Sequence, residues 1–217
     1  MHPEWLSNAY VIGDREGGVA VFVDSGADPR PLHEAVERWG STPVAILRTH
    51  AHHDHVAHED ELRERYGIHV VAEPGSWSWG DLRVRGIATP GHSDDMVAFV
   101  VDDEAVFTGD TLFKDAVGGG NPAQVKTSVM DVLMALPDST RVLPGHTDQT
   151  TIGREREENP FVRVWSGAAP EGTERVKVGG RDATLVVWSP DYDGKGKAWV
   201  RFDDGGDAIV GGSRVER

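Results

Sequence analysis

The chain has 217 residues, and its 36 Asp and Glu against 22 Lys and Arg leave a net charge of −14. Because phosphate contacts require cationic patches, this balance disfavours nucleic acid as a partner. The sequence has no cysteine, which excludes disulfides, thiolate metal ligands and a cysteine nucleophile. No stretch approaches the roughly 18 uncharged residues of a transmembrane helix, and no basic-then-apolar signal opens the chain. We therefore expect a cytoplasmic protein without a membrane partner.

The first half of the chain predicts short strands mixed with helices. Residues 8–12 and 19–23 are apolar and β-rich, and a glycine-rich turn joins them, so we expect an opening hairpin. Residues 31–39 have apolar side chains at helical spacing and are followed by Gly40, as an amphipathic helix is. The other elements expected here are a charged helix over 56–66 and strands over 44–47, 68–72 and 82–87.

The second half predicts a hairpin over 96–101 and 105–108, a helix over 124–136 and a strand over 141–143. Four short strands follow, over 175–178, 183–188, 198–202 and 208–210. We therefore expect a main domain of residues 1–166 and a small β-rich C-terminal module of residues 167–217. Trp188, Tyr192 and Trp199 are expected mainly in the core of this module. Whether it is structural, binds substrate or joins copies of the chain into a homo-oligomer stays open.

The most unusual stretch is His50-Ala51-His52-His53-Asp54-His55, which lies between a predicted strand and a predicted helix. A packed core does not require such a run. Neutral imidazoles and carboxylates are ligands for divalent metals, and a catalytic site needs about three protein ligands per ion and an open position. The run therefore predicts one part of a metal site.

Three further candidate ligands follow predicted strands and stand beside glycines: His92, Asp110 and His146. Our hypothesis is a dinuclear site in which His50, His52 and His92 hold one ion, Asp54, His55 and His146 hold the second, and Asp110 bridges both. This donor set predicts two divalent metal ions, zinc first, with iron or manganese also permitted. The remaining histidines are expected to be solvated or to contact the ligands without binding metal themselves. They are His2, His33, His53, His58 and His69.

The order and context of these motifs resemble the metallo-β-lactamase superfamily. Four segments of this chain stand where that family has its metal motifs: Thr49–His55, Gly91-His92-Ser93, Gly109-Asp110-Thr111-Leu112-Phe113 and Pro144-Gly145-His146. The resemblance covers roughly residues 5–160 and implies an α/β fold, a four-layer αββα sandwich with metals at one sheet edge. A small all-β appendage would follow it. Within the superfamily, the motifs are most similar to those of glyoxalase II-like hydrolases.

The resemblance implies a hydrolase that acts on a small molecule. Two ions sharing a water lower its pKa, and the bridging hydroxide would attack a thioester or related ester carbonyl while Asp54 orients it. A thioester suits this chemistry because a thiol, with a pKa of about 8.5, leaves readily as thiolate. Residues 117–122 read Val-Gly-Gly-Gly-Asn-Pro and depart from the glyoxalase II pattern, so another thiol carrier than glutathione is open. Lys114 and Lys126 are the basic candidates for a substrate carboxylate.

Three alternatives are weighed against the hydrolase. A mononuclear non-haem iron persulfide dioxygenase would use only His50, His92 and Asp110 as ligands. A lactonase would share the metal set, but such enzymes carry a catalytic tyrosine between the bridging aspartate and the last histidine, and this chain has none there. A noncatalytic metal-binding module is the third alternative. The complete ligand set favours the hydrolase.

Overall fold

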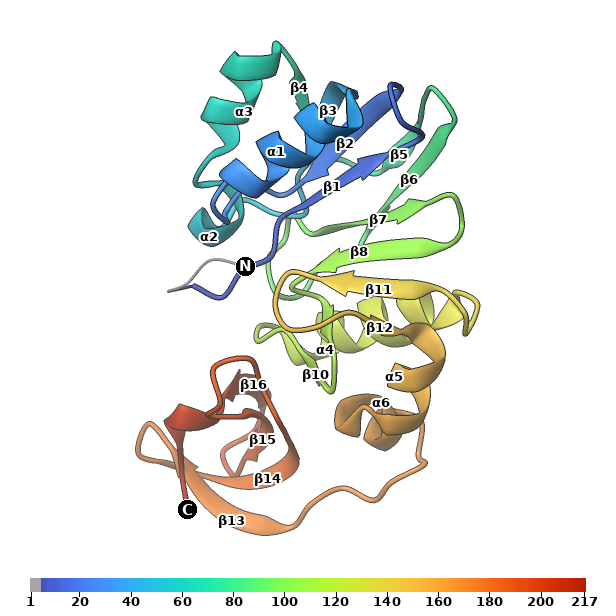
Figure 1. Cartoon of the computed structure of the whole chain (residues 1–217). Coiled ribbons are helices and arrows are strands. Elements are labelled where there is room, and N and C mark those ends of the chain that lie inside the picture. The colour runs from blue at the N-terminus through green and yellow to red at the C-terminus, as the bar shows by residue number, and fades with distance from the viewer. Residues whose placement is uncertain (1–4) are drawn as a thin grey trace.

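The structure is a computed structural model that describes residues 5–217, and two sheets packed face to face form its centre (Figure 1). The first sheet has the strand order β1-β2-β3-β4. Its strands are β1 (Tyr10–Gly13), β2 (Val19–Val23), β3 (Thr42–Leu47) and β4 (His69–Val71). The pair β1 and β2 is antiparallel, whereas β2, β3 and β4 run parallel. The carboxyl ends of β2 and β3 therefore meet at one edge of the sheet.

The second sheet has the strand order β12-β11-β8-β7-β6-β5. Its strands are β5 (Gly75–Trp79), β6 (Leu82–Ala88), β7 (Val97–Val101), β8 (Ala105–Gly109), β11 (Arg141–Pro144) and β12 (Thr150–Thr151). Its neighbours are antiparallel except β8 and β11, which run parallel. The short strands β9 (Leu112–Phe113) and β10 (Ala116–Val117) form a separate ribbon.

Helices cover the outer face of each sheet and complete the predicted four-layer αββα sandwich, which is confirmed. The helices α1 (Arg30–Trp39) and α3 (Glu59–Tyr66) pack on the first sheet. The second sheet is covered by α4 (Pro122–Thr127), a π-helical turn (Ser128–Val132), a 3₁₀ turn (Leu133–Ala135), α5 (Ile152–Glu158) and α6 (Pro160–Trp165). Phe99, Phe107 and their neighbours fill the space between the sheets.

The helix predicted over 56–66 is present as α3, which begins three residues later than predicted, and a separate short helix, α2 (His53–Val56), precedes it. The loop after β2 causes the break. The backbone N–H of Ser25 donates to the carbonyl of His55 at 2.7 Å, and the N–H of His58 donates to the carbonyl of Ser25 at 2.9 Å. These contacts occupy backbone groups that a continuous helix would pair internally.

The longest of the elements that were not predicted are β5, α5 and α6. The side chain of Asn159 accepts hydrogen bonds from the backbone of Phe161 and Val162, and Pro160 stands at the first position of α6. Such an Asn-Pro start is typical of a helix N-terminus, so this signal was present in the sequence. The helix expected over 124–136 is present as three consecutive helical segments of different type.

The C-terminal residues form a third, antiparallel sheet of strand order β16-β15-β14-β13-β17, which confirms the all-β appendage. Its strands are β13 (Glu174–Val178), β14 (Arg181–Ser189), β15 (Lys197–Phe202), β16 (Asp207–Gly211) and β17 (Val215–Glu216), with a 3₁₀ turn at Gly212–Arg214. No helix among residues 5–217 is long and apolar enough to cross a membrane. The domain boundary at residue 166 stays a prediction.

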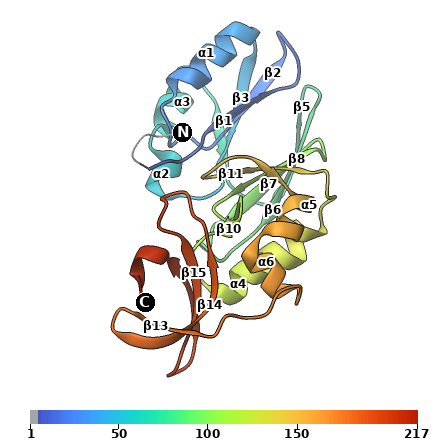
Figure 2. The same cartoon turned by 60° about the horizontal axis from the view of Figure 1, so that its bottom comes forward.

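One face of the C-terminal sheet packs against α4 and α6 (Figure 2). Val187, Trp199 and Ile209 share one buried cluster with Val125 and Phe161 of the sandwich. The opposite face has its own smaller cluster, built around Val176, Leu185 and Val200. Of the three aromatic residues expected in the core of the module, Trp199 is buried, whereas Trp188 is 37% exposed. The appendage therefore shares its core with the main domain.

We expect Phe161→Ala to lower the free energy of unfolding by about 3–5 kcal/mol, since it empties a fully buried site in this shared cluster. Urea denaturation measures the loss. The control is Trp188→Ala in β14 of the C-terminal sheet, which should cost less than half as much because the side chain is already partly solvated. Equal losses for the two variants would contradict the importance of the shared cluster.

Candidate metal centre

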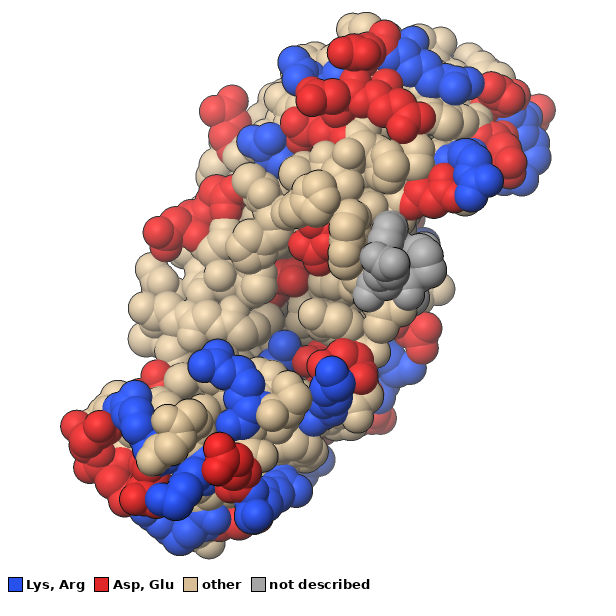
Figure 3. Space-filling view, turned by 90° about the vertical axis from the view of Figure 1, so that its left-hand side faces the viewer, with Lys and Arg blue, Asp and Glu red and all other residues tan. Residues whose placement is uncertain are grey.

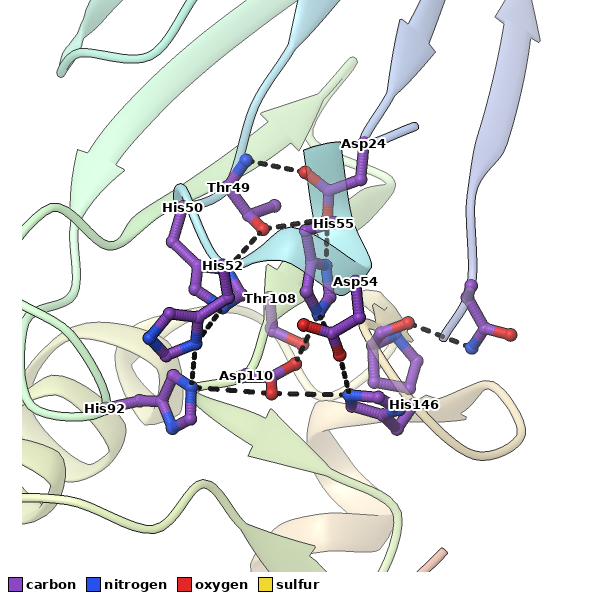
Figure 4. A network of polar contacts seen from close by, with 12 residues as sticks. Asp24, Thr49, His50, His52, Asp54, His55, His92, Thr108, Asp110 and His146 are labelled. Carbon is purple, nitrogen blue, oxygen red and sulfur yellow. Dashed lines mark hydrogen bonds and ion pairs between the residues drawn. The ribbon is translucent and has the colours of Figure 1, made fainter. Parts of the chain in front are cut away.

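The structure brings all seven predicted ligands together at one edge of the two sheets (Figure 4). His50 and His52 follow β3, whereas Asp54 and His55 lie in α2. His92 lies in the loop between β6 and β7, Asp110 directly follows β8, and His146 lies two residues beyond β11. Because β8 and β11 are parallel neighbours, their carboxyl ends place Asp110 and His146 side by side. Their role as metal ligands remains a prediction that the geometry below supports.

The first group consists of His50, His52 and His92. His52 Nδ1 lies 3.0 Å from His50 Nε2 and 2.9 Å from His92 Nε2. These nitrogens converge on one point from two different loops. This is the set predicted for the first ion.

The second group consists of Asp54, His55 and His146, with Asp110 between it and the first group. Asp110 Oδ1 lies 3.3 Å from His55 Nε2, and its Oδ2 lies 3.4 Å from His146 Nε2 and 3.6 Å from His92 Nε2. Asp54 Oδ2 lies 3.4 Å from His146 Nε2. The carboxylate of Asp110 therefore stands where a bridge between two ions would stand.

The outer nitrogens of four histidines are held by acceptors, so that their Nε2 atoms face the centre. His92 Nδ1 donates to the carbonyl of Gly119 at 2.8 Å, and His146 Nδ1 donates to that of Leu6 at 3.0 Å. His55 Nδ1 donates to Asp24 Oδ2 at 2.8 Å. His50 Nδ1 lies 3.1 Å from the Thr49 hydroxyl. Since that hydroxyl donates its own proton to Asp24 at 2.8 Å, it accepts from His50.

Asp24 is a functional residue that the sequence analysis missed. Its buried carboxylate accepts from the backbone N–H and the hydroxyl of Thr49 and from His55, and so it orients both His50 and His55. It follows β2 directly, while Thr49 comes shortly after the parallel neighbour β3. A carboxylate at a strand end was visible in the sequence, but only the pairing of β2 with β3 shows what it contacts.

The donor set fits divalent cations. In the first group the two Nε2 atoms of His50 and His92 point at one His52 nitrogen, whose single proton can satisfy only one of their lone pairs. In the second group, His55 Nε2 and Asp110 Oδ1 are buried without a hydrogen-bond partner. Leaving buried polar atoms unpaired costs free energy. A cation in each group would satisfy these atoms, and nitrogen with oxygen donors suits zinc, iron or manganese.

Charge in the centre is divided between the two groups. Burial and the neighbouring charge of His55 lower the pKa of His50 to about 4, and burial lowers the pKa of His92, so these two imidazoles are neutral. Burial opposes charge on His55 and His146 as well. The carboxylates around them outweigh it, raising the pKa of His55 to about 11 and that of His146 to about 9. The same contacts hold the pKa of Asp110 well below its usual range despite its burial. The second group is therefore built to hold positive charge.

Glycines permit the close approach of these groups. A Cβ on Gly145 would lie 2.3 Å from Asp110 Oδ1 and 2.6 Å from a ring carbon of His55. A Cβ on Gly26 would lie 1.5 Å from the backbone carbonyl oxygen of Asp54. All three distances are shorter than real Cβ contacts. The glycine of the Pro-Gly-His motif is thus required by the carboxylate packed against it.

The face of the molecule that carries α2 is hollowed and mostly uncharged in its middle (Figure 3). Lys, Arg, Asp and Glu gather at its two ends, and a few acidic atoms lie at the floor of the hollow. Lys114, one predicted contact for a substrate carboxylate, forms an ion pair with Asp148 at 3.3 Å. Lys126, the other candidate, lines a cavity of about 730 Å³ with Trp165, Trp199 and Arg201.

The histidines outside the ligand set differ in their surroundings. His33 is buried and contacts Tyr66 and Glu61, so it is neither solvated nor a support for the ligands. His53 packs its ring edge against Trp5, and His58 contacts Glu61. His69 is exposed, as expected. His2 lies outside the described residues.

Tyr192 of the C-terminal module is a second residue at the site that was not predicted there. Its ring stacks on that of His146, with centroids 4.0 Å apart and an interplanar angle of 9°. A tyrosine is thus present at the centre although none lies between Asp110 and His146 in the sequence. The centre therefore contains a tyrosine, as the lactonase alternative requires.

Comparisons with known proteins agree with this architecture. A profile described as the metallo-beta-lactamase superfamily matches residues 2–81. The probable metallo-hydrolase YqgX of Bacillus subtilis is 31% identical over 201 residues, covering 74% of this chain and 94% of the relative. A hydroxyacylglutathione hydrolase of Bradyrhizobium sp. is 37% identical over 158 residues, covering 63% and 61%. The crystal structure of TTHA1623 in a di-iron-bound form has a TM-score of 0.63 and 32% identity, covering 74% and 97%.

The chain therefore belongs to the metallo-β-lactamase superfamily. The resemblance stated from the motifs is confirmed. The match covers almost the whole length of YqgX but only about three quarters of this chain. A quarter of this chain therefore lies outside the match.

We expect Asp24→Asn to weaken zinc binding about 10- to 100-fold, because the amide loses the charge that orients His55. Titration of the metal-free protein with zinc against a competing chelator measures the affinity. Asp14→Asn is the matched control, since Asp14 is another carboxylate with a buried side chain that accepts backbone N–H groups, in the turn between β1 and β2. Unchanged zinc affinity in Asp24→Asn would count against a positioning role.

Gly145→Ala should reduce zinc content to below one ion per chain, because the added methyl group displaces Asp110 and His55 from their positions. Elemental analysis of protein purified in the presence of zinc gives the ratio. Gly211→Ala is the control, since its Cβ would meet nothing closer than 3.8 Å. A Gly145→Ala protein that retains two zinc ions would show that the close packing here is dispensable.

Proposed function

We propose that this protein is a dinuclear metal-dependent hydrolase that cleaves a thioester or a related ester of a small molecule. The observation that supports it is the second ligand group. Asp54, His55 and His146 stand beside the first group and share Asp110 with it. A mononuclear oxygenase of the facial-triad type needs only three protein ligands for its one iron. The second ligand group would bind no metal in such an enzyme.

When bound, two divalent ions supply a water of lowered pKa and polarise the carbonyl group of the substrate. Asp54 is the catalytic residue in this proposal. Its side chain is 29% exposed, compared with 8% for Asp110, so it is the ligand carboxylate that faces the hollow. Asp54 would accept a hydrogen bond from the attacking water and orient it toward the substrate carbonyl.

Zinc is the proposed metal, and iron is the alternative because TTHA1623 is described in a di-iron-bound form. A thioester is supported by the Bradyrhizobium relative, which is named for the hydrolysis of hydroxyacylglutathione. The largely uncharged middle of the face in Figure 3 favours a substrate with few charges near its reacting end. Nucleic acid is not proposed as a partner.

Asp54→Ala should lower kcat for thioester hydrolysis about 10²- to 10⁴-fold, since it removes the group that orients the attacking water and one ligand of the second ion. Metal content by elemental analysis should fall from two ions to one. Thioester hydrolysis and sulfur-dependent oxygen uptake are measured on the same samples. Asp60→Ala, which removes an exposed carboxylate of α3, is the control and should match the wild type.

A different result would support the persulfide dioxygenase. That outcome is one iron per chain in the wild type, with oxygen uptake that is indifferent to Asp54→Ala. Two ions per chain without hydrolysis of any thioester, ester or lactone would instead support a noncatalytic metal-binding protein.

A further inference from the structure

The loop between β14 and β15, residues 190–196, leaves the C-terminal sheet and reaches the metal centre (Figure 2). Its Tyr192 lies flat on the ring of His146, and its edge meets the ring of Phe113 at a centroid distance of 5.9 Å. Phe113 also meets His146, at 5.7 Å. The three rings form one aromatic wall beside the second ligand group.

The position of Tyr192 is held by its neighbour in the chain. The carboxylate of Asp191 accepts from the backbone N–H of Tyr192 at 2.9 Å and forms an ion pair of 2.9 Å with Lys197. Both charged side chains are buried, with 3% and 10% exposed. The Lys197 ammonium also lies 5.7 Å from the centroid of the Tyr192 ring. A buried ion pair of this kind specifies one conformation, because any other arrangement leaves a charge unpaired.

Tyr192 is the accessible member of the wall. Phe113 and His146 are each only 1% exposed, whereas Tyr192 is partly exposed. Its stacking on His146 places the ring of Tyr192 beside a predicted ligand of the second ion. The free part of the ring is therefore next to the space in which the substrate reacts.

We propose that the ring of Tyr192 is a substrate-contacting wall that selects a flat, apolar group next to the reacting carbonyl. This inference rests on the proposed function and names the chemical class that its site prefers. The C-terminal module is then part of the substrate site. An aromatic ring stacked on such a group strengthens binding about 2- to 12-fold beyond the effect of burying its area.

The test compares two carboxylates that resemble acyl products, benzoate and acetate, binding to the zinc-loaded full-length protein by isothermal titration calorimetry. Benzoate should bind more tightly than acetate to the wild type. Tyr192→Ala should weaken benzoate about tenfold and leave acetate within about twofold. Tyr192→Phe should keep the wild-type affinity for both, because the ring rather than the hydroxyl forms the contact. Lys195→Ala, an exposed side chain of the same loop, is the matched control.

Four outcomes would overturn the proposal. They are unchanged benzoate affinity in Tyr192→Ala, an equal loss of acetate and benzoate, a Tyr192→Phe variant as weak as Tyr192→Ala, and no preference for benzoate in the wild type. The second would mark loss of the metal site, and the third would assign the contact to the hydroxyl. The affinities for benzoate and acetate are measured without catalytic turnover. A lack of thioester hydrolysis in the Asp54 experiment would therefore contradict the proposed function, whereas the benzoate and acetate affinities test the contact with Tyr192 separately.

Discussion

The metal centre depends on one constraint: each of the four imidazoles that points its Nε2 inward needs an acceptor for its outer Nδ1–H. Gly119, Leu6 and Asp24 provide these acceptors directly, and Thr49 provides one through its hydroxyl. Without them, rings would rotate or change tautomer, and the Nε2 lone pairs would no longer converge. The acceptors come from segments far apart in the sequence, so the complete sandwich is needed to orient these four side chains toward the two ligand groups.

The same arrangement makes the centre costly without cations. Three features of the centre are unfavourable in a protein interior: buried carboxylates, imidazoles that share protons, and polar atoms that lack hydrogen-bond partners. The raised pKa values of His55 and His146 show that the surrounding carboxylates already favour positive charge there. Divalent ions meet that requirement more completely than protons do, because one ion contacts several donors at once. Stability of the fold and occupancy of the site are therefore coupled.

The superfamily fold by itself leaves the reaction open, since one scaffold can carry many chemistries. Here the second ligand group supports hydrolysis, and the C-terminal sheet adds features that the sandwich lacks. This sheet shares a buried cluster with the helices α4 and α6, and its loop places Tyr192 against His146. Because the module is anchored through packed side chains, its loop can present an aromatic ring at a defined place.

From the sequence by itself came the prediction of seven ligands in two groups, because their residue types stand beside predicted strand ends, and the class of fold, through the resemblance of those motifs to the metallo-β-lactamase superfamily. The break between α2 and α3 and the supporting role of Asp24 were decided by tertiary structure, through the loop after β2 and the parallel pairing of β2 with β3. Tyr192 reaches His146 across 46 residues of sequence. No local pattern encodes such a contact, since it arises only when a separate sheet docks on the sandwich.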